Sequence, residues 1–220
     1  MSRLKVLFTL VSSMGLAVAA DTTPAGTAPV QTNAVAVFIS QRMFLDEALQ
    51  VVTRRLEARG YRPVLVARDT GLAIGMDQTV VRPGLMLGEC RSENFAALII
   101  INGSGIATYW QDTVIHAKCR EFAAAGRVIG GIGIATICLA RAGVLRGHKA
   151  TILPDRHAVR ELLVGGARYW PNPVVTDRNI VTAADSQHIR RFMDVLVRLL
   201  DTRNRSRQDT GRLTSGAGHW

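Results

Sequence analysis

The sequence predicts a three-layer α/β sandwich, in which helices cover both faces of a mainly parallel sheet. Strand-like runs alternate with helix-like segments from residue 34 to about residue 200, and parallel strands require such crossover connections. Two strand-like runs, AVAVFIS at 34–40 and FAALIIING at 95–103, are almost entirely apolar, as expected of strands buried on both faces. The length of 220 residues and the hydrophobic content of 48% suit one domain with a sizeable core.

The expected elements follow one another along the chain. After the first strand, apolar residues recur at helical spacing from Leu45 to Leu56, and Gly60 is placed to end that helix. The stretch up to about residue 94 is less regular and is expected to contain a short hairpin around Pro83 and Gly84. The other expected elements are strands at 62–68 and 95–103, a helix at 112–125, the strand-turn-helix segment VIGGIGIATICLARAGVLRG at 128–147, strands at 148–153, 173–176 and 179–183, and an amphipathic helix at 186–200.

The first twenty residues have the pattern of a secretory signal peptide. Arg3 and Lys5 precede an apolar run at 6–16, which is followed by small residues with a cleavage point near Ala19 or Ala20. An uncleaved membrane anchor is the alternative, but the run is shorter than the ~20 residues that span a bilayer. The sequence therefore predicts an exported protein, periplasmic or secreted, with no stable membrane anchor after cleavage.

Two segments are expected to flank the domain without joining it. Residues 21–33 are polar and suit a flexible leader, and residues 201–220 lack an apolar period and suit a disordered basic tail. Lys and Arg number 27 against 17 Asp and Glu, a formal net charge of +10. The tail has no aromatic-basic motif, so no nucleic-acid partner is expected. The tail arginines are Arg203, Arg205, Arg207 and Arg212.

No metal or cofactor site is indicated. Cys90, Cys119 and Cys138 have no CxxC spacing, so neither a zinc site nor a disulfide framework is predicted. Pairing of Cys90 with Cys119 in an oxidising compartment remains open. The segment GGIGIA lacks the third glycine of a dinucleotide-binding fingerprint.

One ligand pocket is expected at the carboxyl ends of the parallel strands, where ligands of open α/β sheets bind. Residues 40–42, 102–105 and 133–136 follow three of these strands and are expected to meet there. The residues expected to line the pocket are Ser40, Gly103, Ser104, Gly133, Ile134 and Thr136.

Two motifs carry a family resemblance, LARAGVLRGHKAT at 139–151 and PVVTDRNIVTA at 173–183. With them, the chain from about residue 34 to residue 200 resembles the ThiJ/PfpI family of the class I glutamine-amidotransferase-like superfamily. The resemblance implies a flavodoxin-like sandwich, a homodimer or larger assembly, and a cysteine on a sharp strand-to-helix turn. Characterised relatives include proteases, chaperones, glyoxalases or deglycases and isonitrile hydratases, so the resemblance leaves the function open.

This sequence departs from the catalytic residues that the resemblance implies. The position of the family cysteine falls on Gly133, that of the following histidine on Ile134, and that of the acidic partner on Leu45. Asp46 lies one residue further along, and a one-residue shift on a helix turns a side chain about 100° away.

The remaining parts of the family site are also changed. The family's Pro-Gly-Gly turn becomes Asn102-Gly103-Ser104, which keeps a backbone amide at Ser104 for an oxyanion. The histidine that some relatives carry before a proline falls on Leu153.

Cys138 is a candidate to replace the missing cysteine nucleophile. It follows Gly133 by five residues, more than one turn inside the expected helix, which favours a buried structural cysteine. Ser104 and Thr136 offer hydroxyls, but no histidine stands in a recognisable elbow motif, and such residues are typical of turn and helix caps.

The sequence thus predicts a non-catalytic binding or interaction module, with a small molecule or a protein as its partner. The alternative is a cysteine-dependent hydrolase, or a glyoxalase- or deglycase-like enzyme, with a displaced nucleophile.

Overall fold

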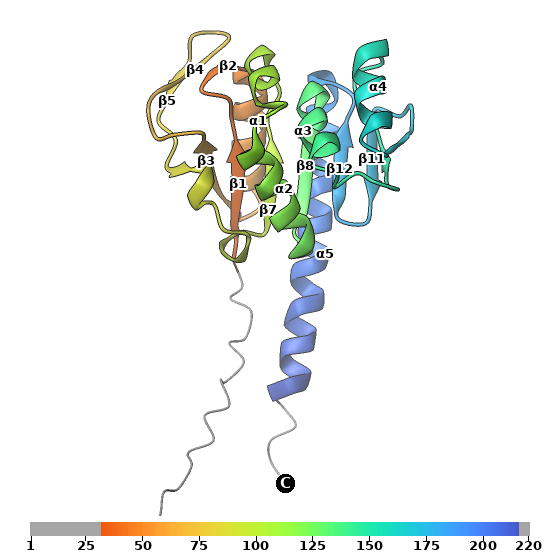
Figure 1. Ribbon diagram of the computed structural model, residues 1–220. Coiled ribbons are helices and arrows are strands. Elements are labelled where there is room, and N and C mark those ends of the chain that lie inside the picture. The colour runs from red at the N-terminus through yellow and green to blue at the C-terminus, as the bar shows by residue number, and fades with distance from the viewer. Residues whose placement is uncertain (1–31, 216–220) are drawn as a thin grey trace, which may run out of the picture.

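A seven-stranded sheet forms the centre of the molecule (Figure 1), with the strand order β11-β12-β8-β7-β1-β3-β6. The computed structural model describes the backbone of residues 32–215 and the side chains of residues 32–206. All neighbouring strands are parallel except β11 and β12, so the mainly parallel sheet predicted from the sequence is confirmed. The strands are β1 (Ala34–Phe38), β3 (Arg62–Ala67), β6 (Leu85–Met86), β7 (Ala97–Ile100), β8 (Val128–Ile132), β11 (Val174–Asp177) and β12 (Ile180–Ala183).

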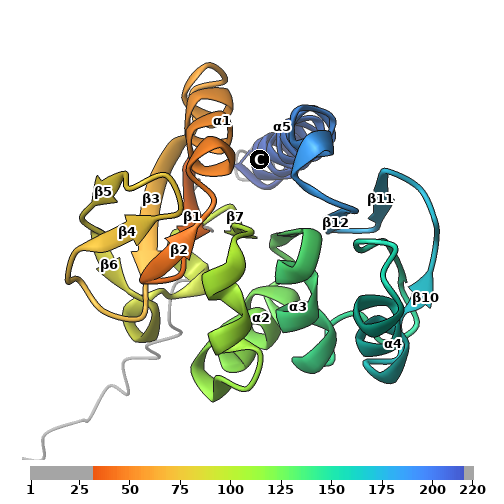
Figure 2. The same ribbon diagram turned by 90° about the horizontal axis from the view of Figure 1, so that it is seen from above.

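Helices cover both faces of this sheet, which confirms the three-layer sandwich. Seen from above in Figure 2, α1 and α5 lie on one face, and α2, α3 and α4 lie on the other. The helices are α1 (Asp46–Glu57), α2 (Thr113–Ala124), α3 (Thr136–Arg141), α4 (Arg156–Val164) and α5 (Ile189–Ser215).

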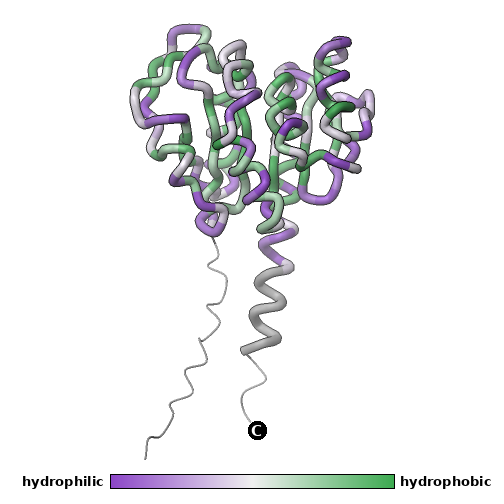
Figure 3. Tube along the Cα trace, in the orientation of Figure 1, coloured by the Kyte–Doolittle hydropathy of each residue, from purple (hydrophilic) through white to green (hydrophobic). Residues whose placement is uncertain are grey.

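The two faces explain why the central strands are apolar throughout. In β1, Val35 and Val37 belong to the core beneath α1 and α5, whereas Ala36 and Phe38 belong to the core beneath α2 and α3. Successive side chains of a strand point to opposite faces, so a strand with a core on each side has no polar positions. Figure 3 shows this apolar interior along the central strands.

A second, three-stranded sheet lies beside the start of α1, in the order β2-β4-β5. Its hairpin joins β4 and β5, and β6 instead pairs with β3 in the main sheet. The hairpin expected around Pro83 and Gly84 is therefore wrong, because the reversal occurs between residues 75 and 80. The strands are β2 (Arg42–Phe44), β4 (Ala73–Gly75) and β5 (Val80–Val81).

The region between α3 and β11 also differs from expectation. Only Lys149–Ala150 forms strand β9, which pairs with β10 (Arg168–Tyr169). Helix α4 follows, where the sequence pattern predicted no helix. Asp155 caps α4, because its carboxylate accepts the backbone N–H groups of His157 and Ala158.

The prediction of a disordered tail from residue 201 is wrong for residues 201–215, because α5 continues to Ser215. Figure 1 shows this helix running well beyond the edge of the sheet. Its extension is tied to the domain, since Asp201 accepts hydrogen bonds from Arg59 at 2.6 Å and Tyr61 at 3.0 Å.

The predicted signal peptide and nearly all of the predicted leader lie outside the described residues. Within the described part of the chain, no helix combines the length and the apolar character that crossing a bilayer requires.

Candidate functional site

The turn after β8 has the backbone of a strand-to-helix elbow. Strand β8 leads into a single 3-10 turn, Gly133–Ala135, and then directly into α3. Gly133 has a φ of +55°, in the left-handed region that costs glycine little and other residues more. The strand-turn-helix segment predicted from the sequence is thus present, with glycine at its sharpest point.

The side chain of Asn102 occupies the space in front of Gly133. A Cβ placed on Gly133 meets Nδ2 of Asn102 at 2.8 Å and its Cγ at 3.1 Å. Asn102 directly precedes Gly103 in the turn after β7, and its backbone carbonyl accepts the N–H of Leu45 at 2.8 Å. The elbow is therefore closed by a neighbouring amide side chain.

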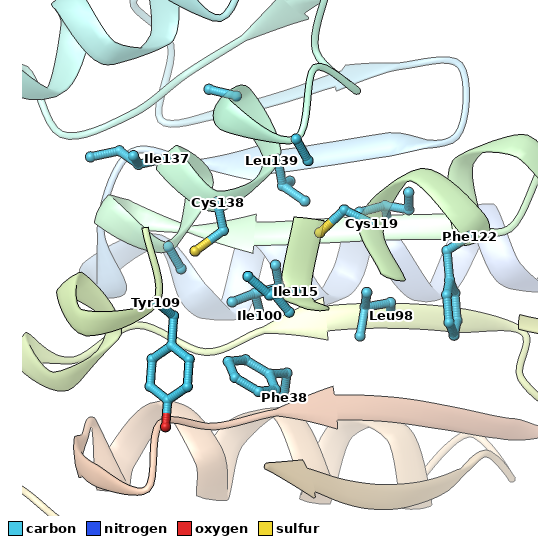
Figure 4. Close-up of a cluster of buried hydrophobic side chains, with 14 of the residues drawn as sticks. Phe38, Leu98, Ile100, Tyr109, Ile115, Cys119, Phe122, Ile137, Cys138 and Leu139 are labelled. Atoms are coloured by element: carbon cyan, nitrogen blue, oxygen red, sulfur yellow. The ribbon is translucent and has the colours of Figure 1, made fainter. Parts of the chain in front are cut away.

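Cys138 lies beneath the elbow, in the core between the helices and the sheet. Figure 4 shows its sulfur directed into the apolar cluster that contains Ile100 and Ile115. The side chain is fully buried, and burial raises the pKa of its thiol to about 12. A thiol in this position stays protonated and out of reach of solvent at neutral pH.

The other two cysteines are buried as well. Cys90, Cys119 and Cys138 are all free thiols, so the pairing of Cys90 with Cys119 that the sequence left open does not form. Burial raises the pKa of Cys90 to about 12 and that of Cys119 well above its ordinary value. The structure thus describes no exposed thiol among residues 32–206.

The acidic side chain next to the family position faces away from the elbow. Leu45 occupies the N-cap position of α1. The buried carboxylate of Asp46 accepts the backbone N–H groups of Asp77 at 2.8 Å and Thr79 at 3.1 Å. Burial alone raises the pKa of Asp46, but these hydrogen bonds outweigh it and lower the pKa. Asp46 therefore fixes the β4–β5 turn.

No described histidine contacts the elbow. Nε2 of His116 lies 3.0 Å from the carbonyl of Trp110, and burial lowers its pKa. The other described histidines pair with carboxylates of their own surroundings, His148 with Asp177, His157 with Glu161 and His188 with Asp185. Leu153, at the position of a histidine in some relatives, is exposed. Residues 32–206 also contain no group of three or more His, Cys, Asp or Glu side chains that is suited to a metal ion.

The six residues predicted to line a pocket gather where β1, β7 and β8 end. Ser40 and Thr136 are buried. The Oγ of Ser40 donates to the carbonyl of Arg42 at 2.8 Å, and the Oγ1 of Thr136 has no described partner. Gly103 and Gly133 are buried, Ile134 is half-buried and Ser104 is exposed.

A hollow opens between the segment after β1 and the 3-10 turn after β7, Ser104–Tyr109. Its volume is about 320 Å³, and we name it the β1/β7 crevice. It is lined by Gln41, Arg42, Met43, Gly105, Thr108 and Tyr109. Gln41, Arg42 and Gly105 belong to segments predicted to meet at the pocket, whereas Met43, Thr108 and Tyr109 lie outside those segments. Their position a few residues beyond two strand ends was the available signal.

Comparisons with known proteins agree with this fold. The model of the DJ-1/PfpI family matches residues 33–199. The chain is 29% identical to an uncharacterized protein of Methanocaldococcus jannaschii over 171 residues, 77% of this chain and 83% of that protein. It is 24% identical to a deglycase of Pyrococcus horikoshii over 165 residues, 74% of this chain and 98% of that protein.

Solved structures show the same architecture. A ThiJ/PfpI domain protein from Brachyspira murdochii superposes with a TM-score of 0.74 at 24% identity, covering 78% of this chain and 98% of that chain. The DJ-1beta of Drosophila melanogaster superposes with a TM-score of 0.68 at 18% identity, covering 83% of this chain and 98% of that chain.

Proposed function

The chain belongs to the DJ-1/PfpI family, and we propose that it is an exported member that has lost the cysteine nucleophile and acts as a non-catalytic binding or interaction module. Family membership alone does not decide the activity, because one fold supports many functions. The proposal therefore rests on the residues at the elbow.

One observation carries the proposal, namely that Asn102 fills the space in front of Gly133. Glycine has no side chain with which to attack a substrate, and a substrate atom cannot approach a position that an amide already occupies. The neighbouring Ile134 is apolar, and Leu45 stands in place of an acidic partner. Nucleophilic catalysis needs an activated nucleophile within reach of a base, and these three positions provide neither.

A cysteine-dependent enzyme is the alternative, and the deglycase of Pyrococcus horikoshii is the relative that suggests it. In this chain the reaction would fall to Cys138. Its complete burial and raised pKa disfavour that role, because the reactive form of cysteine is an accessible thiolate.

Activity assays on the purified mature protein test the proposal. We expect no turnover of methylglyoxal, of methylglyoxal-modified amino acids or of a fluorescent casein above the buffer rate, with the Pyrococcus horikoshii deglycase as the positive control. A variant with Ser at positions 90, 119 and 138 serves as the matched negative control. Robust turnover by the wild type would overturn the non-catalytic assignment, whether or not this variant retains it.

Export is tested separately. The pattern of residues 1–20 supports cleavage near Ala19 or Ala20. Mass spectrometry of the protein made from the full chain is expected to show loss of these residues in the exported fraction. A full-length, uncleaved product confined to the cytoplasm would contradict this part of the proposal.

A further inference from the structure

We propose that the β1/β7 crevice binds a small carboxylic acid that has an apolar body and one hydrogen-bond donor, of which an apolar amino acid is the simplest example. This inference rests on the proposed function as a binding module and names the chemical class of its ligand.

The crevice lies where the connections of the sheet diverge. From β1 the chain passes through α1 to β3, and from β7 it passes through α2 to β8, on the opposite face of the sheet (Figure 2). The segments that leave β1 and β7 therefore lead to opposite faces of the sheet, although they still pack against each other where Gly105 meets Arg42. Open α/β sheets bind ligands at such switch points, outside the carboxyl ends of the strands.

The walls of the crevice are held rigidly. A Cβ placed on Gly105 would lie 1.7 Å from the backbone oxygen of Arg42, so only glycine permits the two segments to pack this closely. Ser40 holds the same oxygen through its Oγ at 2.8 Å. Met43 has a φ of +59°, a strained conformation for a residue with a side chain, and such strain clusters at ligand sites. The site is thus largely formed before a ligand arrives.

Two polar groups at the crevice have unused hydrogen-bonding capacity. Nε2 of Gln41 donates to the carbonyls of Gly71 at 2.8 Å and Leu72 at 3.1 Å, which fixes the orientation of the amide because both partners only accept. Its Oε1 has almost no accessible surface and no partner among the described residues, so a donor on the ligand would pair with this unsatisfied acceptor after a small displacement of the groups that cover it. The hydroxyl of Tyr109 accepts the backbone N–H of Gln41 at 3.1 Å, so its own hydrogen is available to an acceptor.

Arg42 supplies the charge. Its side chain is exposed and forms no ion pair with any residue of the described range. The nearest acidic residue along the chain, Asp46, is occupied by the β4–β5 turn. A guanidinium group without a partner matches a carboxylate in geometry and charge. The ligand is therefore expected to be an acid.

The volume of the crevice and its apolar lining indicate the size of the ligand and its apolar body. Met43 and the ring of Tyr109 offer apolar contact, and that ring is fixed edge-on to Phe38, with centroids 5.2 Å apart. Figure 4 shows the Tyr109 ring beside Phe38, with its hydroxyl pointing toward the segment after β1. A volume of about 320 Å³ lies at the lower end of small-molecule pockets, which suits a molecule of amino-acid size.

Three matched probes test the assignment by NMR titration of the mature protein. L-phenylalanine has the apolar body, the carboxylate and the donor, 3-phenylpropanoate lacks the donor, and 2-phenylethylamine lacks the carboxylate. We expect saturable amide shifts confined to residues 41–43 and 105–109, with L-phenylalanine binding about ten-fold more tightly than either analogue.

Two variants locate the binding. Arg42→Gln is expected to weaken L-phenylalanine and 3-phenylpropanoate about ten-fold and to leave 2-phenylethylamine within about two-fold. Thr108→Phe fills the crevice and is expected to abolish all three. Arg160→Gln, at another exposed arginine, is the matched control and should leave every affinity unchanged.

The inference is overturned if none of the probes gives saturable shifts up to about 10 mM, or if Arg42→Gln and Thr108→Phe bind them as the wild type does. Either result in a protein without turnover leaves the proposed function standing. Turnover of methylglyoxal, of methylglyoxal-modified amino acids or of fluorescent casein would overturn the proposed function whatever the crevice binds.

Discussion

The elbow after β8 and the β1/β7 crevice lie on the same edge of the sheet, and a closely packed glycine shapes each of them. At the elbow, Gly133 packs against a side chain, the amide of Asn102. At the crevice, Gly105 packs against backbone, the carbonyl of Arg42. A side chain can rotate or be replaced by a single mutation, whereas a backbone contact changes only when two segments of the fold move apart. The elbow is therefore closed by a replaceable side chain, whereas a wall of the crevice is fixed by the backbone itself.

The largest effect is expected from Gly105→Ala. The added methyl group would overlap the carbonyl oxygen of Arg42, which lies only 1.7 Å from the Cβ position, and the segment after β1 would have to move. We expect the free energy of unfolding to fall by about 3 kcal/mol or more in urea denaturation. Gly84→Ala is the control, because its Cβ position has no neighbour within 4 Å and its φ is not positive. A loss below about 1 kcal/mol in Gly105→Ala would mean that this wall is not rigid.

A smaller effect is expected at the elbow, and it should depend on Asn102. Gly133→Ala is expected to cost about 2 kcal/mol, partly from the positive φ and partly from contact with the amide. In an Asn102→Ala background the contact is absent, so the same change is expected to cost only about 1 kcal/mol. The four proteins of this double-mutant cycle are compared by urea denaturation. Strictly additive losses would show that Asn102 does not obstruct the elbow.

The two sites also differ in how far the sequence reveals them. The elbow could be predicted because all of its signals are local: an apolar strand, a glycine at the turn and a helical pattern directly after it. The crevice depends on Tyr109 reaching back to the backbone of Gln41, 68 residues earlier, and on a strained Met43. Neither feature leaves a periodic pattern, so none of the six residues named for the predicted pocket lines the crevice, although the predicted segments 40–42 and 102–105 reach it.

The same distinction applies to the fold. Buried strands were predicted well, because a strand with a core on both faces is apolar at every position. The helical start of the C-terminal segment from residue 201 was not predicted, because its polar residues resemble those of a disordered segment. Its first turn is instead held by Arg59 and Tyr61, which bond to Asp201 from more than 130 positions away. The short helix α4 was missed for a related reason, since it carries only two buried residues, Ala158 and Leu162.

The smallest effect concerns the thiol beneath the elbow and appears as a dependence on pH. Burial raises the pKa of Cys138 from an ordinary 9.0 to about 12. Above pH 9 the unfolded chain therefore releases this proton while the folded protein retains it. A raised pKa in the folded state gives a stabilisation that is complete below about pH 9 and is lost as the pH rises from there toward 12.

Cys138→Ala removes this contribution. Between about pH 7 and pH 10, the free energy of unfolding of the wild type is expected to fall by about 1 kcal/mol more than that of the variant. Ile137→Val is the control, because it changes a buried neighbour without a titrating group and should follow the wild-type profile. Parallel profiles for wild type and Cys138→Ala would mean that the thiol is solvated in the folded protein. In that case one of the two reasons for excluding Cys138 as a nucleophile would be lost, and the elbow would differ from the crevice only in the group that closes it.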